Sequence, residues 1–94
     1  GAIYTKEGKI NITNAKYKDD MSHISSDPNS PYHDYTKSYL HHLFKAEEML
    51  AGTIASAHNL YFMINLVRNI RQSLLDGKFF EFKKEFLGLY YKQL

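Results

Sequence analysis

The sequence predicts a mainly helical α+β domain with an N-terminal β-hairpin, a long polar loop and three helices. Three observations support this prediction. Apolar and polar residues alternate near the N-terminus, polar residues and prolines fill the next stretch, and apolar residues then recur every three or four positions. A chain of 94 residues has the size of one small domain. We therefore treat residues 1–94 as a single unit, with the hairpin in 1–17, the loop in 18–34 and the helical part in 35–94.

The hairpin is predicted from two short runs of β-branched and aromatic residues. These runs are Ala2–Thr5 and Lys9–Thr13, and the Lys-Glu-Gly between them has the composition of a turn. Gly8 accepts the positive φ that such a turn needs. Ile10 and Ile12 alternate with polar neighbours, so one face of the second strand should be apolar. Because a lone hairpin is marginally stable in water, we expect other elements to cover that face.

The loop at 18–34 has an unusual composition for a small domain. It holds both prolines of the chain, and its residues 19–34 include four acidic residues and no lysine or arginine. Structureless loops of this length are uncommon, and they are usually functional, held by a metal or disordered.

Three helices are predicted after the loop. Their approximate ranges are 34 or 36 to 50, 54 to 76 and 78 to 91. Asp34 and Thr36 both suit the first N-cap, Gly52 permits the break after the first helix, and Gly77 suits a left-handed C-cap of the second. The core expected between the helices consists of Leu40, Phe44, Leu60, Ile64, Val67, Ile70, Phe82 and Phe86.

An aromatic face is predicted on the first helix. Tyr35, Tyr39 and His42 follow a spacing of four and then three residues, which places them on one side of the helix. They either pack against the second helix or form an interface with a partner, for which tyrosine is well suited.

The sequence holds little that suggests catalysis. It has no cysteine, which excludes disulfides, thiolate metal sites and thiol nucleophiles. His41 and His42 are adjacent and point about 100° apart on a helix, so they do not share a metal easily. Glycine-rich phosphate loops, HExxH motifs and nucleophile sets are absent. The basic residues of the second half are expected to form a solvated face: Arg68, Arg71, Lys78, Lys83 and Lys84. The net charge of +2 is small, and no apolar run is long enough to predict a membrane span.

Four segments carry a resemblance to one family. They are EGKINITNAKY at Glu7–Tyr17, YTKSYLHHL at Tyr35–Leu43, AHNL at Ala57–Leu60 and GKFFEF at Gly77–Phe82. In this order and spacing they resemble the segments EGxINIxNAKY, YSRAYLHHL, xHNL and GRFxxF of bacterial tRNA-guanine transglycosylase, also called queuine tRNA-ribosyltransferase. The resemblance extends along essentially the whole chain.

The resemblance implies the C-terminal zinc subdomain of a TIM-barrel enzyme. That enzyme exchanges guanine at the wobble position of certain tRNAs for a queuine precursor through a covalent aspartate–ribose intermediate. Its catalytic and base-binding residues lie upstream of the matched part, so we expect the chain alone to catalyse no exchange. The implied setting is a cytoplasmic homodimer that binds tRNA through the full-length enzyme, with no membrane contact.

The family's zinc site is the main departure. The family binds zinc with C-x-C-x-x-C in the loop and one later histidine, which matches His58. The three cysteine positions fall on Asp27, Asn29 and Tyr32 without a gap, or on Pro28, Ser30 and His33 after a shift of one residue. Neither register has a thiol, and Asp27, His33 and His58 would form a poor set of hard ligands. We therefore expect zinc to be absent and the loop to be loosely held.

The family's dimer contact involves the helix after the zinc loop, and Tyr35, Tyr39 and His42 fall on the matching positions. The predicted role is thus dimerisation and support of the tRNA-binding surface. One alternative is a free-standing helical protein-interaction module without enzymatic role. Another is a small nucleic-acid-binding domain, which the low net charge and the acidic loop disfavour.

Overall fold

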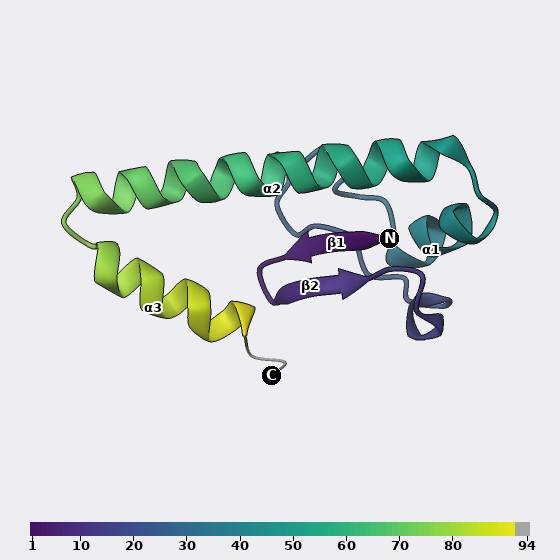
Figure 1. The fold of residues 1–94 in the computed structure, drawn as a ribbon, viewed down its shortest axis with the longest axis horizontal. Helices are drawn as coiled ribbons and strands as arrows, with labels where there is room; N and C mark the ends of the chain where they lie inside the picture. Colours follow the sequence, from purple (N-terminus) through teal and green to yellow (C-terminus); the bar gives the residue numbers. More distant parts are fainter. Residues whose placement is uncertain (92–94) are drawn as a thin grey trace.

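The computed structural model describes residues 1–91, and it places a small hairpin and two shorter helices beside one long helix (Figure 1). The elements in chain order are β1 (Ala2–Thr5), β2 (Gly8–Asn11), the 3₁₀-helix η1 (Ala15–Tyr17), α1 (Lys37–Lys45), α2 (Met49–Leu75) and α3 (Phe79–Tyr90). The predicted order of hairpin, loop and three helices is confirmed.

The hairpin is antiparallel and slightly shorter than predicted. Its register pairs Ala2 with Asn11 and Thr5 with Gly8. Gly8 has a φ of +119°, so the turn uses the conformational freedom that glycine provides. The second strand ends at Asn11 because the side chain of this residue accepts a hydrogen bond from the backbone N–H of Thr13 at 3.1 Å. This Asx-turn directs the chain into η1.

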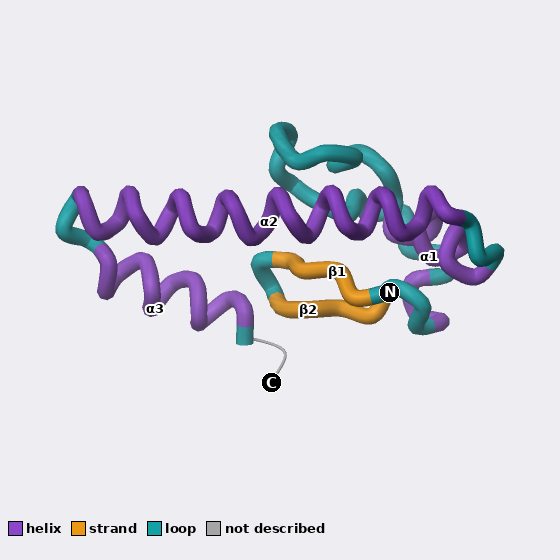
Figure 2. Tube along the Cα trace, turned by 45° about the horizontal axis from the view of Figure 1, so that its top comes forward, coloured by secondary structure: helices purple, strands orange, loops and turns teal. Residues whose placement is uncertain are grey.

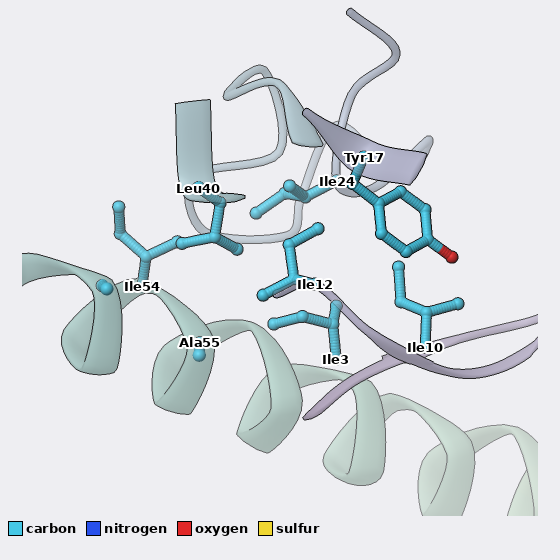
Figure 3. Close-up of a cluster of buried hydrophobic side chains, with 9 residues drawn as sticks. Ile3, Ile10, Ile12, Tyr17, Ile24, Leu40, Ile54 and Ala55 are labelled. Carbon is cyan, nitrogen blue, oxygen red and sulfur yellow. The ribbon is translucent and has the colours of Figure 1, made fainter. Parts of the chain in front are cut away.

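The core lies where the hairpin, the loop, α1 and the first turns of α2 meet (Figure 3). Its buried apolar residues are Ile3, Ile10, Ile12, Tyr17, Ile24, Leu40, Ala51, Ile54 and Ala55. Four of them have virtually no exposed surface: Ile3, Ile12, Leu40 and Ile54. The hairpin therefore supplies much of the apolar volume of the domain, and α1 and α2 cover it as expected.

The boundary between the first two helices differs from the prediction. The first helix ends at Lys45 rather than near Leu50, and Gly52 lies inside α2, so the predicted break at that glycine is wrong. Glu47 adopts a φ of +56°, and the backbone N–H of Glu48 donates across the last turn at 3.0 Å. This is a Schellman ending with glutamate in the position that glycine usually occupies.

The second helix ends as predicted. Gly77 has a φ of +69°, and the backbone N–H of Lys78 donates to the carbonyl of Ser73 at 2.8 Å. The left-handed glycine reverses the chain so that α3 runs back beside α2 (Figure 2). Within residues 1–91, none of the helices has both the length and the apolar character that crossing a membrane requires.

The predicted core is only partly correct. Leu40 is fully buried and Phe44 packs against the core, but Leu60, Ile64 and Val67 are 63%, 49% and 55% exposed. Ile70, Phe82 and Phe86 are half-buried. The correction has a geometric cause: the hairpin and the loop cover one side of α2, whereas Leu60, Ile64 and Val67 project about 120–180° away from Ala55 and His58. We call this exposed face the apolar stripe of α2; it consists of Leu60, Met63, Ile64, Val67 and Leu74.

Candidate functional site

His58, the predicted metal ligand, lies on α2 and is only 3% exposed. Its Nε2 donates to the backbone carbonyl of Tyr4 at 2.6 Å, which fixes the tautomer because a carbonyl only accepts. Burial lowers the pKa of His58, while the bond to Tyr4 opposes this effect. The ring is therefore held neutral. Its Nδ1 is buried without a hydrogen-bond partner among the described residues, which is the arrangement expected of a metal-binding histidine.

The next residue, Asn59, binds the outer edge of β1. Its Oδ1 accepts from the backbone N–H of Tyr4 at 2.9 Å, and its Nδ2 donates to the carbonyl of Ala2 at 2.9 Å. Together with His58, it satisfies three backbone groups of the strand. The AHNL segment thus joins α2 to the hairpin, a role that sequence reasoning missed.

Asp27, the second candidate ligand, is already engaged by protein groups. One carboxylate oxygen accepts from the hydroxyl of Tyr61 on α2 at 2.8 Å, and the other accepts from the backbone N–H of Asn29 at 2.9 Å. Both hydrogen bonds hold the pKa of Asp27 below its usual value, and the bond from Asn29 has the larger effect. The same contact with Asp27 raises the pKa of Tyr61. The carboxylate and the phenol are therefore ionised and neutral, respectively, around neutral pH.

The donor set does not fit the family's zinc. Within residues 1–91, no three side chains of the His, Asp and Glu types converge, so Asp27, His33 and His58 are not brought together. In the gap-free register, Tyr32 has no thiol to offer and its ring contacts Tyr35 instead. Of these three candidates, His58 is the one whose ring nitrogen is buried without a hydrogen-bond partner within residues 1–91.

Backbone hydrogen bonds and one buried side chain connect the loop to the rest of the domain. The backbone N–H of Ile24 donates to the carbonyl of Tyr35 at 2.9 Å, and that of Lys37 donates to Ser22 at 2.9 Å. The side chain of Ile24 is buried in the core. These contacts and the bond that Asp27 accepts from Tyr61 connect the loop to α1 and α2, and the prediction of a loosely held loop stays a prediction.

A cavity of about 440 Å³ lies between the hairpin, the loop, α2 and α3. Asp27, Ser30, His58 and Tyr61 all contribute to its wall, and Phe82 contributes to it from α3. The hydroxyl of Ser30 is also buried without a partner among the described residues. The cavity is therefore lined by polar groups from the loop, the hairpin and α2 and by aromatic rings from the hairpin, α2 and α3.

The predicted aromatic face is present in part, because Tyr35 precedes the N-cap Thr36 and therefore lies outside α1. The rings of Tyr35 and Tyr39 meet edge to face with centroids 5.5 Å apart, and Tyr39 is 46% exposed. Tyr32 extends this group because its ring lies 5.4 Å from that of Tyr35, which the spacing on a helix did not predict. His42 is exposed, and its Nε2 donates to the carbonyl of Lys18 at 3.1 Å. We call Tyr35, Tyr39 and His42 the aromatic surface.

Comparison with known proteins agrees with the resemblance in the sequence. The family model described as queuine tRNA-ribosyltransferase matches residues 1–92. Queuine tRNA-ribosyltransferases of Francisella tularensis subsp. tularensis (strain WY96-3418) and subsp. novicida (strain U112) are each 50% identical over 93 residues, covering 96% of this chain. The chain spans about a quarter of the length of these relatives, 25% in both cases. The chain therefore belongs to the queuine tRNA-ribosyltransferase family.

Proposed function

We propose that this chain is the C-terminal subdomain of a queuine tRNA-ribosyltransferase, a TIM-barrel enzyme that exchanges guanine in tRNA during queuosine modification. The subdomain contributes dimerisation and support of the tRNA-binding surface, and it holds none of the catalytic residues. Family membership and the coverage of a quarter of each relative support this role. The reaction places the enzyme with its tRNA substrate in the cytoplasm.

The apolar stripe of α2 carries this proposal. A helix with one apolar face against a hairpin and a second apolar face in solvent is typical of a helix inside a larger structure. Leu60 and Val67 are more than half exposed, and Leu74 continues the stripe at 59%. Contiguous apolar patches of this kind usually mark a contact surface. We assign the stripe to contact with the remainder of the enzyme, since family membership favours the subdomain over a free-standing module.

The absence of catalytic residues can be tested directly. Residues 1–94, purified alone, are expected to incorporate no radiolabelled guanine into a substrate tRNA, because the nucleophile and the base-binding groups belong to the upstream part. The full-length enzyme under the same conditions is the positive control. Incorporation by the isolated chain at a rate above the tRNA-only background would contradict the proposal that the catalytic residues lie in the upstream part.

The dimerisation role predicts a specific effect at the aromatic surface. Tyr39→Ala in the full-length enzyme should raise the dimer dissociation constant at least about tenfold, since buried tyrosines are frequent interface hot spots. Native mass spectrometry at low micromolar concentration measures the monomer fraction. Tyr91→Ala is the matched control, because Tyr91 is similarly exposed, at 54%, but follows α3. Equal dissociation constants for Tyr39→Ala and the unmodified enzyme would exclude this surface from the interface.

The basic residues on α2 and α3 are compatible with tRNA support. Arg68 and Arg71 on α2 and Lys83 and Lys84 on α3 are exposed. Exposed lysine and arginine side chains bind phosphates without sequence preference. We propose that tRNA contacts this subdomain only as part of the full-length enzyme, because the net charge of the chain is small.

A further inference from the structure

We propose that a direct hydrogen bond between Asp27 and Tyr61 fastens the loop at 18–34 to α2 in this chain, in place of the metal that the family uses. The proposal depends on family membership, because it compares this loop with the family's zinc loop. It does not depend on the proposed roles in dimerisation and tRNA support. The proposal rests on where the two residues lie, on how Asp27 is held, and on the mismatch between the donor set and zinc.

Tyr61 occupies the right position for this contact. It follows His58 by three residues on α2, so the two side chains lie on the same face of the helix, and both contribute to the wall of the same cavity. The hydroxyl of Tyr61 reaches Asp27 at 2.8 Å across 34 positions of sequence. In the gap-free register, Asp27 stands at the first of the three cysteine positions. The bond therefore connects the same loop and the same helix face that a metal would connect.

Asp27 is presented to Tyr61 by its own turn. Its backbone N–H donates to the hydroxyl of Ser25 at 3.1 Å, and its carbonyl accepts from the backbone N–H of Ser30 at 3.0 Å. Its second carboxylate oxygen accepts from Asn29. With three of its four polar atoms engaged by its own turn, Asp27 is oriented before Tyr61 binds. A hydrogen bond to a carboxylate is stronger than one between neutral groups, and it pays little entropy when its acceptor is already fixed.

The contact between Asp27 and Tyr61 differs from a thiolate–metal site in its response to chelators and oxidants. Thiolate ligands lose their metal to chelators and to oxidants. A carboxylate–phenol contact responds to neither. The loop of this chain should therefore keep its place under oxidising and metal-poor conditions.

Hydrogen–deuterium exchange of the loop in the full-length protein tests the proposal. Tyr61→Phe should speed the exchange of the amides of Asp27, Asn29 and Ser30 about tenfold, the size expected for loss of a hydrogen bond to a charged group. Treatment of the unmodified protein with 1,10-phenanthroline should leave these amides unchanged. Tyr91→Phe is the matched control, since it removes a hydroxyl from a tyrosine that is 54% exposed and follows α3, away from the loop.

A double-variant cycle separates this contact from a general loosening of the structure. Asp27→Ala alone and Asp27→Ala with Tyr61→Phe should exchange at the same rate, because each removes the same bond. The proposal is overturned if the two effects multiply, or if Tyr61→Phe exchanges like the unmodified protein. It is also overturned if stoichiometric zinc is found by mass spectrometry and its removal accelerates exchange in the loop.

Discussion

Replacing Leu40 with alanine is expected to lower the free energy of unfolding of the 94-residue chain by about 3–5 kcal/mol. Leu40 is 0% exposed and belongs to the cluster formed by the hairpin, the loop and the start of α2. Truncation removes apolar contacts and leaves a cavity that the surrounding strands and helices fill only in part. Because small domains have about 5–15 kcal/mol of stability in total, this one change removes a large share of it.

Urea denaturation followed by circular dichroism at 222 nm measures the effect. Leu75→Ala is the matched control, since Leu75 lies at the end of α2 and is 76% exposed. The control should change stability by less than about 1 kcal/mol, as most exposed positions do. A loss below about 1 kcal/mol for Leu40→Ala would contradict the assignment of the core.

Replacing Gly8 with alanine is expected to destabilise the chain by about 2–4 kcal/mol, the combined cost of backbone strain and of displaced backbone. Gly8 has a φ of +119°, which residues with a side chain rarely adopt. A Cβ at this position would also lie 2.9 Å from the carbonyl oxygen of Tyr90. That contact joins the hairpin turn to the last turn of α3, so the substitution strains the turn and pushes the helix away.

A second glycine gives a control with the opposite sign. Gly52 lies inside α2, and a Cβ there would meet no atom within 4 Å. Gly52→Ala should therefore stabilise the chain by about 0.5–1 kcal/mol through helix propensity alone. Thermal unfolding of both variants by calorimetry measures the difference. Similar melting temperatures for the two variants would show that neither the positive φ nor the contact with Tyr90 limits position 8.

The order of the elements could be predicted from local signals, but the position of the core could be predicted only in part. Gly77 marks a helix end because glycine alone adopts left-handed backbone without strain, whereas Glu47 gives no such signal at the other helix end. Leu60 and Val67 have the spacing of core residues, yet they are exposed in this chain. Periodicity identifies an apolar face, and it does not identify the surface that covers it.

The candidate site shows the same division between local and long-range information. Spacing and the family motifs point to His58 and to the aromatic surface, and their roles in zinc binding and dimerisation stay predictions. The contact of Asp27 with Tyr61 joins residues 34 positions apart, and no local pattern predicts such a pair. Tyr32 was missed for a related reason: it precedes α1 and joins the aromatic group through a left-handed turn at φ +58°.

The hydrogen bonds that Asn59 and His58 form with β1 also affect the tendency of this chain to aggregate at high concentration. Exposed strand edges recruit further strands, and this is a common start of fibril growth. Here side chains from α2 occupy the N–H of Tyr4 and the carbonyls of Ala2 and Tyr4. A third strand would have to displace an amide and an imidazole before it could add to this edge. Two polar residues of a helix thus block the β1 edge of this hairpin against the strand addition to which small sheets are prone.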